Sequence, residues 1–461
     1  MLINGVRTAL LLMNQLTNKQ VNLPIAIGIT NEPINLTMIY QNTLAFAKQL
    51  DEQDPLKDFR SKFFIPQHEA NDTVYFTGNS LGLQPKSTAA YIQQELNDWS
   101  QYGVEGHFHA KNPWLSYHEM FPKLLSPIVG SLEEEIVVMN QLTVNLHLLM
   151  VSFYRPTKQR YKIICEAKAF PSDQYALESQ VKFHGFDYAD AVVEVEPRAG
   201  EHTIRLEDIL STIEQHKDAV ALVMFGGVNY YTGQLFDMQT IAAAAHNAGA
   251  YCGFDLAHAA GNIELKLHDW KVDFACWCSY KYLNSGPGGV AGAFIHEQHI
   301  VNENMHRFAG WWGYTKATRF KMDKGFEPIH TAEGWQLSNA PVLSMAAHKA
   351  SLDIFGEAGM DRLHEKRKLL AGYLHFVLNE INQKQKEKLI EVITPTNETE
   401  RGCQVSMLML KDGKKIFDAL MQQGVIADWR EPNVVRVAPV PLYNSFEDVW
   451  RFGNIISGLI G

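Results

Sequence analysis

The sequence predicts an α/β protein. It has a large domain with a mostly parallel sheet covered by helices on both faces, plus a smaller α+β domain from the C-terminus and N-terminal segment. Three observations predict this class. Short β-branched apolar runs alternate with longer helical patterns from about residue 130. A long helical stretch rich in Lys, Glu and Leu begins near residue 341. The 461 residues, 46% of them hydrophobic, can fill two or three cores.

The large domain is expected to contain short apolar strands at 136–139, 161–166, 219–225, 251–255, 274–278 and 290–295. Helical patterns lie between strands, at 143–153 and 238–248. This alternation indicates parallel strands covered on both faces. In such sheets, ligands bind beyond the carboxyl ends of the strands. Polar side chains that directly follow a strand are therefore the first candidates for a functional site.

The sequence pattern changes after residue 341. A helical stretch at 341–379 is followed by predicted strands at 404–410 and 434–437, and by helical patterns at 414–423 and 446–459. We expect residues 106–340 to form the large domain and 341–461 the small one, joined by an N-terminal segment at 38–105. Residues 1–37 are expected to be a disordered extension. One hypothesis places the biological start at Met38, with helical patterning in 39–50.

Composition excludes several classes of protein. The net charge is −10, from 41 Lys and Arg against 51 Asp and Glu, so we expect no basic face for nucleic acid. No apolar run approaches the roughly 20 residues that span a membrane. Five cysteines without a framework spacing fit a reducing cytoplasm. The sequence therefore predicts a cytoplasmic globular protein.

Two chemically useful residues follow neighbouring strands of the large domain. Asp255 ends the run 251–255, and Lys281 follows the strand at 274–278. Alone, such an Asp is usually a helix cap and such a Lys is usually solvated. Together they match the needs of pyridoxal phosphate, which takes a lysine amine as a Schiff base and an acid beside its pyridine nitrogen. The sequence thus predicts a pyridoxal-phosphate site with the covalent Schiff base on Lys281.

A phosphate cradle is expected where a strand turns into a helix, at Leu142 and Thr143. Backbone N–H groups and the Thr hydroxyl face an anion there, and an ordinary N-cap role is compatible with this. The glycine-rich stretch 286–289 lacks the Gly-Lys-Ser/Thr of a P-loop and the dinucleotide spacing. We interpret it as a tight turn beside Lys281.

Nine segments, in order from about residue 60 to the C-terminus, together resemble kynureninase, a pyridoxal-phosphate family of the aspartate-aminotransferase fold (fold type I). They are FTGNSLGLQP at 76–85, LTVNLH at 142–147, FPSDQY at 170–175, YYTG at 230–233, DLAHA at 255–259, CWCSYKYLN at 276–284, GWWG at 310–313, SN at 338–339 and RVAPVPLY at 436–443.

The resemblance implies roles for individual residues. Lys281 is the Schiff-base lysine and proton carrier, Tyr280 a further proton donor, and Asp255 the partner of the pyridine nitrogen. The implied cofactor-binding residues are Leu142, Thr143, Phe170, Pro171, Ser172, Asp173, Asp255, His258, Tyr280, Lys281, Trp311 and Asn339. Phe170 stacks on the ring, and Trp311 reaches the phosphate from the second subunit. Arg436 clamps the α-carboxylate of the substrate, with Asn339 and Ser80 beside it.

The implied activity is hydrolysis of L-kynurenine, 3-hydroxy-L-kynurenine or both, giving anthranilate or 3-hydroxyanthranilate and L-alanine. The resemblance also implies a homodimer with shared active sites, in tryptophan catabolism by the kynurenine pathway or in NAD biosynthesis. Three departures from relatives leave the substrate preference open. Gly226 stands where some carry a hydroxyl near the phosphate, Tyr314 replaces a histidine, and the histidines at 107 and 109 are shifted.

Other functions are open to the sequence. An aminotransferase or a cysteine-desulfurase-like lyase would use the same cofactor, although a desulfurase needs a reactive cysteine on a mobile loop. A non-catalytic cofactor-binding protein would bring a DNA-binding domain, for which 37 N-terminal residues are too few. No metal site is predicted, because Cys276 and Cys278 have no second cysteine pair or Cys-x-x-Cys spacing, and His107 and His109 lack a third ligand.

Overall fold

The computed structural model describes residues 39–302 and 304–460, so the extension expected at 1–37 lies outside the described residues. Residues from Gln41 onward form one compact unit. Its first helix, α2 (Leu44–Gln53), begins later than the predicted stretch 39–50, because Thr43 is its N-cap. The Thr43 hydroxyl accepts a hydrogen bond from the Phe46 N–H at 3.3 Å and fixes this start.

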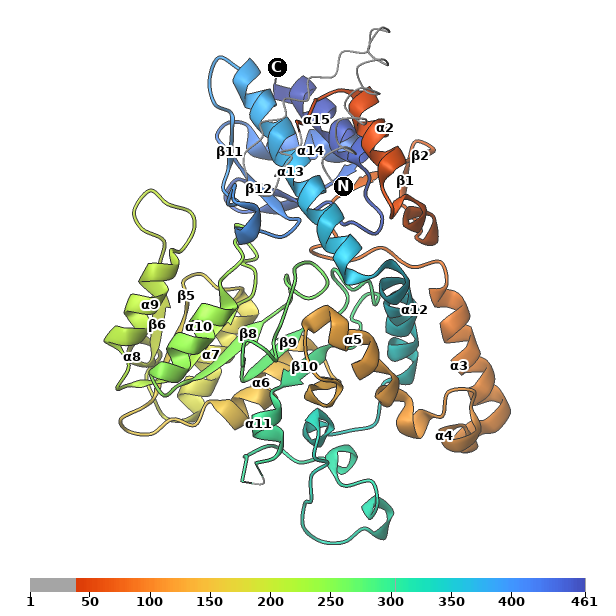
Figure 1. Ribbon diagram of the computed structural model, residues 1–461, viewed down its shortest axis with the longest axis vertical. Helices are drawn as coiled ribbons and strands as arrows, with labels where there is room; N and C mark the ends of the chain where they lie inside the picture. The colour runs from red at the N-terminus through yellow and green to blue at the C-terminus, as the bar shows by residue number, and fades with distance from the viewer. Residues whose placement is uncertain (1–38, 303, 461) are drawn as a thin grey trace, which may run out of the picture. The chain divides into compact units, whose positions relative to one another are not determined.

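Seven strands form the central sheet, in the order β4-β10-β9-β8-β7-β5-β6 (Figure 1). Their bounds are β4 Ile136–Val138, β5 Lys162–Glu166, β6 Val192–Val195, β7 Val220–Gly226, β8 Tyr251–Asp255, β9 Phe274–Trp277 and β10 Gly292–Ile295. The pairs from β6 through β9 are parallel. Only β10 runs against its neighbours, β9 and β4. The predicted mostly parallel sheet is therefore confirmed, and β6 is a strand that sequence patterning missed.

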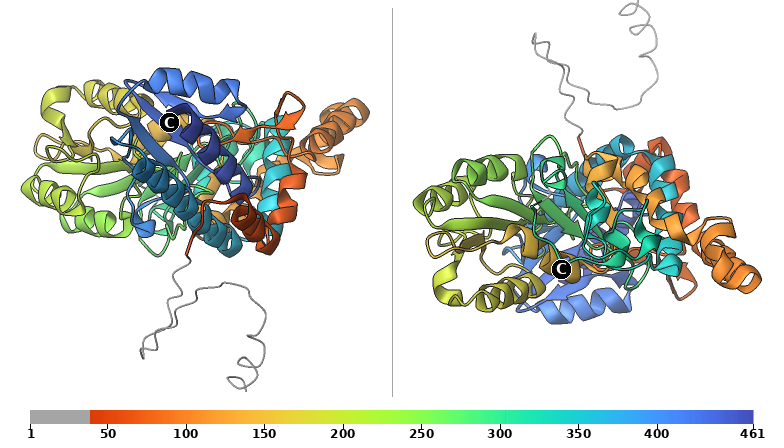
Figure 2. Two further views of the ribbon diagram at one scale, coloured as in Figure 1. Left: turned by 90° about the horizontal axis from the view of Figure 1, so that it is seen from above. Right: turned by 90° about the horizontal axis from the view of Figure 1, so that it is seen from below.

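Helices cover both faces of this sheet (Figure 2). Alternate strand residues enter two separate apolar cores, since successive side chains in a strand point to opposite faces. Leu222 and Met224 of β7 pack with α6 (Leu142–Phe153) and α7 (Pro171–Phe183). Val223 and Phe225 of the same strand lie in the other core, with α9 (Leu206–Gln215) and α10 (Met238–Asn247). Burial on both faces explains why the strands are almost continuously apolar.

A second, antiparallel sheet has the order β11-β12-β15-β14. Its strands are Ile390–Val392, Val405–Met409, Val434–Val437 and Asp428–Arg430 in that order, and α13 (Met360–Lys384), α14 (Gly413–Gln422) and α15 (Phe446–Ile460) accompany it. An N-terminal strand, β3 (Val74–Tyr75), pairs in parallel with β13 (Val425–Ile426). Residues far apart in the chain thus build this part of the fold together.

The helical stretch expected at 341–379 is two helices, so its continuity was predicted wrongly. Gly359, with φ of +76°, separates α12 (Val342–Ala358) from α13. Such a positive φ is easy only for glycine, which ends the first helix there. The helix α12 packs on α3 (Thr88–Tyr102), whereas α13 packs on α15. The domain division near residue 341 stays a prediction.

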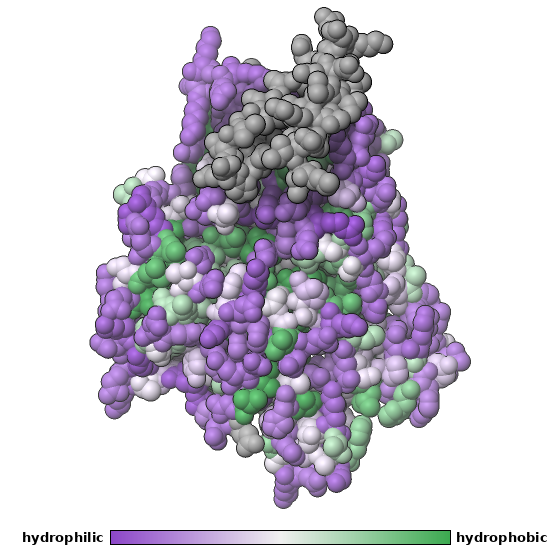
Figure 3. Space-filling view, in the orientation of Figure 1, coloured by the Kyte–Doolittle hydropathy of each residue, from purple (hydrophilic) through white to green (hydrophobic). Residues whose placement is uncertain are grey.

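Short elements complete the described chain. They are β1 Gln67–His68, β2 Asn71–Asp72, α4 Gly106–His109, α5 Phe121–Val129, α8 Tyr188–Ala191 and α11 Glu297–Ile300, with 3₁₀ turns at Lys57–Lys62, Gly103–Glu105, Trp114–Met120, Glu133–Glu135, Trp311–Gly313, Arg319–Lys321, Ala332–Trp335 and Glu398–Glu400. Among the described residues, none of the helices combines the length and apolarity needed to cross a bilayer. The face in Figure 3 is mostly hydrophilic where its residues are described.

Candidate active site

A cleft opens at the carboxyl ends of the parallel strands, where the sequence predicts ligand binding. Residues from the ends of β5, β7 and β8 and from the starts of α6 and α7 line this cleft. Its lining residues are Leu142, Thr143, Glu166, Phe170, Ser172, Asp173, Gly226, Val228, Tyr230, Asp255, Ala257, His258, Cys278, Tyr280 and Lys281. The structure therefore brings together most of the cofactor-side residues that the sequence predicts.

Lys281 lies in the loop after β9, with its side chain buried in the cleft. Its Nζ lies 3.1 Å from Nε2 of His258, and 5.7 Å from the ring centroid of Phe170. Burial, and next the neighbouring Lys281 cation, lowers the pKa of His258, so this imidazole is neutral and accepts the hydrogen bond. Its other nitrogen, Nδ1, then carries the proton, and that buried group has no partner.

Three buried carboxyl groups share the cleft: Asp255 at the end of β8, Asp173 in the first turn of α7, and Glu166 at the end of β5. Burial raises the pKa of Asp255, while the Ala257 N–H, at 2.6 Å, opposes the rise. Burial first, and then the Asp255 charge, raises the pKa of Asp173 well above its usual value. The two carboxyl groups are hydrogen-bonded to each other, so Asp173 holds a proton toward Asp255.

The N-terminus of α6 borders the same cleft. The first backbone bond of this helix runs from the Asn145 N–H to the Gln141 carbonyl, at 3.0 Å. The N–H groups of Leu142 and Thr143 precede that bond, and Gln141 supplies no side-chain cap. A helix N-terminus with unused N–H groups and a hydroxyl beside it is suited to a phosphate dianion. Leu142 and Thr143 therefore begin α6 at the edge of the cleft, and their role as a phosphate cradle stays a prediction.

Ser80 lies in an N-terminal turn that is held against the Lys281 loop, and it does not line the cleft. The Gly82 N–H donates to the Tyr280 carbonyl at 2.8 Å, and a Cβ on Gly82 would lie 2.3 Å from the Lys281 carbonyl oxygen. Only glycine permits this close approach. The motif around Ser80 therefore serves at least to pack the loop that carries Lys281.

Arg436 lies on β15, with 1% of its surface exposed. Its Nε and Nη2 lie 3.0 and 2.8 Å from Oδ1 of Asp428, and its Nη1 donates to the Tyr230 carbonyl. Tyr230 lines the cleft, and its ring centroid is 6.0 Å from the guanidinium carbon. The guanidinium thus lies beside the cleft, held in one orientation from behind.

Three predicted cofactor residues do not line this cleft. Pro171 is the first residue of α7 and shapes the helix start beside Phe170. Asn339 lines a separate cavity with Gln141, next to the N-terminus of α6. Trp311 is 45% exposed, and its indole N–H donates to the Arg319 carbonyl at 3.2 Å. Their roles as cofactor ligands stay predictions.

Sequence reasoning missed two residues of this site. Glu166 ends a predicted strand just as Asp255 does, so the same signal was available for it. Its carboxylate accepts the Gly226 N–H, with oxygens at 2.9 and 3.2 Å, and burial raises its pKa to about 7. A Cβ on Gly226 would lie 2.9 Å from the same carboxylate. Asp428, the partner of Arg436, had no signal in the sequence.

All five cysteines are buried. Burial raises the pKa of Cys165, Cys252, Cys276 and Cys278, and it raises that of Cys403 to about 12. A thiol needs access and a lowered pKa to act as a nucleophile. Cys278 lines the cleft, but burial of its thiol and its raised pKa oppose the nucleophilic role that the desulfurase alternative requires.

Known proteins resemble this chain in sequence and in fold. The kynureninase C-terminal domain family matches residues 363–456. A kynureninase of Flavobacterium psychrophilum is 60% identical over 419 residues, covering 91% of this chain and 98% of that protein. A kynureninase of Mus musculus is 47% identical over 430 residues, covering 90% and 92%.

Among solved structures, a cysteine desulfurase of Thermococcus onnurineus superimposes with a TM-score of 0.70 at 18% identity, covering 88% of this chain and 98% of that one. A cystine C–S lyase in complex with cysteine persulfide gives 0.69 at 16%, covering 83% and 97%. At such identities the likeness shows a shared fold alone.

Proposed function

Because the chain belongs to the kynureninase family, we propose that it hydrolyses L-kynurenine, 3-hydroxy-L-kynurenine or both, releasing L-alanine and the corresponding anthranilate. The observation that carries this proposal is the convergence of a lysine, a hydrogen-bonded carboxyl pair and a helix N-terminus in one cleft. These are the three requirements of pyridoxal phosphate. The remaining residues of the site are assigned on that basis.

Two orphaned polar atoms support the fit of this cofactor. Nδ1 of His258 and Oδ1 of Asp173 are buried side-chain atoms with no hydrogen-bond partner. Such groups cost about 1–3 kcal/mol each unless something pairs with them. A polar aromatic ring in the cleft would supply partners. Lys281 would hold the cofactor as a Schiff base, Asp255 and Asp173 its pyridine nitrogen, Phe170 its ring face, and Leu142, Thr143, Tyr280 and Ser172 its phosphate side.

When bound, pyridoxal phosphate supplies an electron sink for the carbanion formed at the substrate's α-carbon. The protein side of the chemistry is proton transfer. Lys281 would hold the cofactor and would act as the base that removes the α-proton of the substrate. Asp255 would face the pyridine nitrogen and favour its protonated form. Neutral His258 accepts a hydrogen bond from Lys281 and holds the Lys281 Nζ in the cleft. Water would add to the γ-carbonyl of the substrate, and the bond between the β- and γ-carbons would break to release the anthranilate. Tyr280, which also lines the cleft, would donate the proton that the β-carbon needs to become the methyl group of alanine.

The substrate's α-carboxylate is assigned to Arg436. The substrate-side roles of Asn339 and Ser80 stay predictions, because neither residue lines the cleft. A homodimer is proposed, in which Trp311 of the partner subunit completes the phosphate site. The exposed aromatic surface of the segment around 308–326 supports this, because Phe308, Trp311 and Phe320 are 58%, 45% and 58% exposed. The buried, reduced cysteines support a cytoplasmic location.

Release of anthranilate, measured by its fluorescence, tests the function directly. Purified protein should be yellow and should form anthranilate or its 3-hydroxy form from the matching substrate. K281A should lose both the bound-cofactor absorbance and multiple turnover. A matched exposed-lysine variant, K158A, should keep both. Normal turnover by K281A would overturn the assignment of Lys281, and colourless, inactive wild-type protein supplied with the cofactor would overturn the proposed function.

A further inference from the structure

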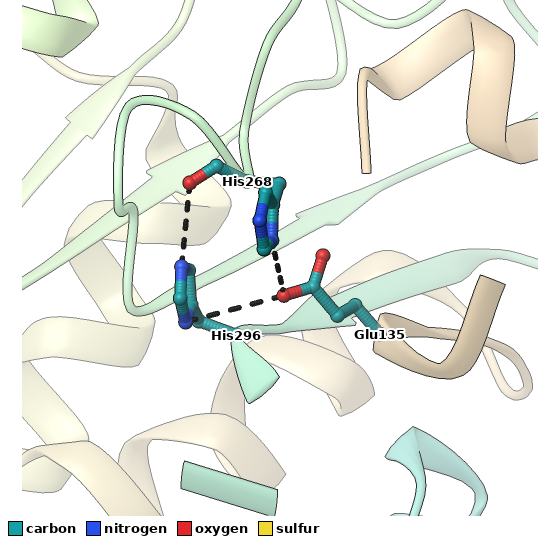
Figure 4. A group of neighbouring side chains, drawn as sticks. All are labelled: Glu135, His268 and His296. Atoms are coloured by element: carbon teal, nitrogen blue, oxygen red, sulfur yellow. Dashed lines mark hydrogen bonds and ion pairs between the residues drawn. The ribbon is translucent and has the colours of Figure 1, made fainter. Parts of the chain in front are cut away.

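A second cluster of polar side chains lies at the ends of the central strands that are opposite to the cleft. Glu135 directly precedes β4, and His296 directly follows the antiparallel β10. Phe294 pairs with Ile136, so the antiparallel register brings these two ends together. His268 arrives from a separate loop, fixed by its N–H bond to the Gly130 carbonyl at 3.0 Å. Three independent backbone segments therefore present one side chain each to a common point (Figure 4).

The geometry points to a transition-metal site formed by Glu135, His268 and His296, with Zn²⁺ as the ion it fits best. One ligand atom from each residue lies within 4.8 Å of the other two. Two imidazole nitrogens and one carboxylate oxygen are a usual three-ligand set for Zn²⁺ and its neighbours in the transition series. A water would take the fourth position, since the His268 side chain is 29% exposed.

The hydrogen bonds prepare the two imidazoles for this role. His296 Nε2 lies 3.3 Å from the His268 carbonyl oxygen, to which it donates, and His296 Nδ1 accepts the Gln298 N–H at 3.2 Å. The lone pair of His296 is therefore on Nδ1, which lies 4.0 Å from Oε1 of Glu135. His268 Nδ1 lies 3.0 Å from the same oxygen. A backbone carbonyl that orients the second ring nitrogen is a common outer partner of metal-bound histidine.

The Glu135 carboxylate is held in place, and no lysine or arginine of the described chain pairs with its charge. Glu135 is fully buried, and its two oxygens each accept a backbone N–H at 2.9 Å: Oε2 from Leu132 and Oε1 from Glu297. Among the described residues, its ion-pair partners are the two histidines alone, with neither lysine nor arginine. Metal binding would release the proton between His268 and Glu135 and replace the long Gln298 contact to His296. The charge of the ion would then compensate the buried carboxylate.

Two other clusters of histidine and carboxylate side chains are less suited to a metal ion than the Glu135 cluster. In the group His118, Glu119 and Glu333, Lys316 already occupies the centre, 2.9 Å from Glu119 and 2.8 Å from Glu333. Asp273 contacts two histidines, but through different oxygens: His299 through Oδ1 at 2.6 Å and His246 through Oδ2 at 2.8 Å. Only at Glu135 do both histidines face one oxygen without a competing cation among the described residues.

Sequence spacing gave no sign of this site, because Glu135 and His268 are 133 residues apart. The site would tie the start of β4, the end of β10 and the loop of His268 into one cross-link. Its expected role is structural, since the cleft lies beyond the other ends of the strands. The prediction of no metal site from cysteine and histidine motifs is therefore the one that this proposal revises.

Binding of Co²⁺ and Zn²⁺ to untagged, chelator-treated holoenzyme tests the proposal. Wild-type protein should bind one Co²⁺ per chain, with visible absorption typical of nitrogen ligation, and Zn²⁺ should displace it. H268Q should bind at least about tenfold more weakly. The matched control is H246Q, since His246 is also a part-exposed histidine on a buried carboxylate, with 32% of its side chain exposed. That variant should bind as the wild type does.

Thermal unfolding keeps the test valid if a variant is unstable. Zn²⁺ should raise the melting temperature of wild-type protein and of H246Q, and it should leave that of H268Q unchanged. Circular dichroism of each metal-free variant establishes that it is folded. The proposal is overturned if wild-type protein shows no saturable binding, or if H268Q binds and is stabilised as the wild type is. Equal weakening in H268Q and H246Q would also overturn it, because it would place the ion elsewhere.

Discussion

Replacement of Arg436 by lysine tests how the substrate carboxylate is held. The described contacts use one N–H on each terminal nitrogen of Arg436, toward Asp428 and the Tyr230 carbonyl. Each terminal nitrogen has a second N–H, and a planar guanidinium can offer a fork of two N–H groups to one carboxylate. Lysine keeps the positive charge but offers a single point donor. The R436K variant therefore removes the fork and leaves the charge.

The expected loss is one charge-assisted hydrogen bond, worth about 1.5–3 kcal/mol. At about 1.4 kcal/mol for each factor of ten, KM for kynurenine should rise roughly 10- to 150-fold. The value of kcat should change much less, because the α-carboxylate is held in the ground state and the transition state alike. The loss is expected at its upper end if lysine also fails to keep the contact with Asp428.

Initial rates of anthranilate release over a range of kynurenine concentrations separate KM from kcat. Arg430 provides a matched control, because it pairs with the same Asp428 oxygen at 2.9 Å but is about one-third exposed. R430K should change KM by less than about threefold, in keeping with the small energies of part-exposed ion pairs. A KM for R436K within about twofold of wild type, or a loss confined to kcat, would refute the assignment of Arg436 as the carboxylate clamp.

Three further predictions concern stability, each measured by urea unfolding of cofactor-free protein. Burial raises the pKa of Glu166 from 4.5 to about 7, so the contribution of the protonated side chain to the free energy of unfolding is fully present below pH 4.5 and is lost as pH rises through 7. E166Q should remove a fall of about 3 kcal/mol in the free energy of unfolding between pH 5 and 8. An unchanged pH profile would contradict this. G253A puts a Cβ 2.1 Å from the ring of Phe274 and should lower the free energy of unfolding by about 1–3 kcal/mol. G356A, in α12 where a Cβ meets no other atom, should raise it by about 0.5–1 kcal/mol. Equal effects would disprove the steric argument. D54N leaves the buried Lys366 without its partner at 2.7 Å and should cost about 3–5 kcal/mol, so a loss below about 1 kcal/mol would count against it.

The parts of the fold that sequence patterning predicted are those decided by local periodicity. Strand β8 has the predicted bounds, and Asp255 at its end was found because polar residues at strand ends face one cleft. The break at Gly359 was missed, because apolar periodicity continues through it and only the backbone angle shows the turn. The start of α2 was missed because a single cap residue, Thr43, decides it.

Side chains brought together by long-range pairing were the other class of miss. Asp428 meets Arg436 because β14 and β15 are antiparallel neighbours with these two residues in register. Glu135 meets His296 through the pairing of β4 with β10. Neither pair has a characteristic spacing, since strand order in a sheet is set by tertiary packing. Lys281 and Asp255 were recognised because their chemistry is specific enough to be searched for.

The pairing of β3 with β13 has a consequence for synthesis of the chain. Val74 donates its N–H to the Gly424 carbonyl, and Phe76 both donates to Ile426 and accepts from Ala438. These partners emerge from the ribosome about 350 residues after β3, which at 5–20 residues per second is a delay of about 18–70 s. Val74, fully buried in the finished protein, has no strand partner during that time. Nascent chains should therefore rely on chaperones until translation is nearly complete, and slow translation should increase aggregation.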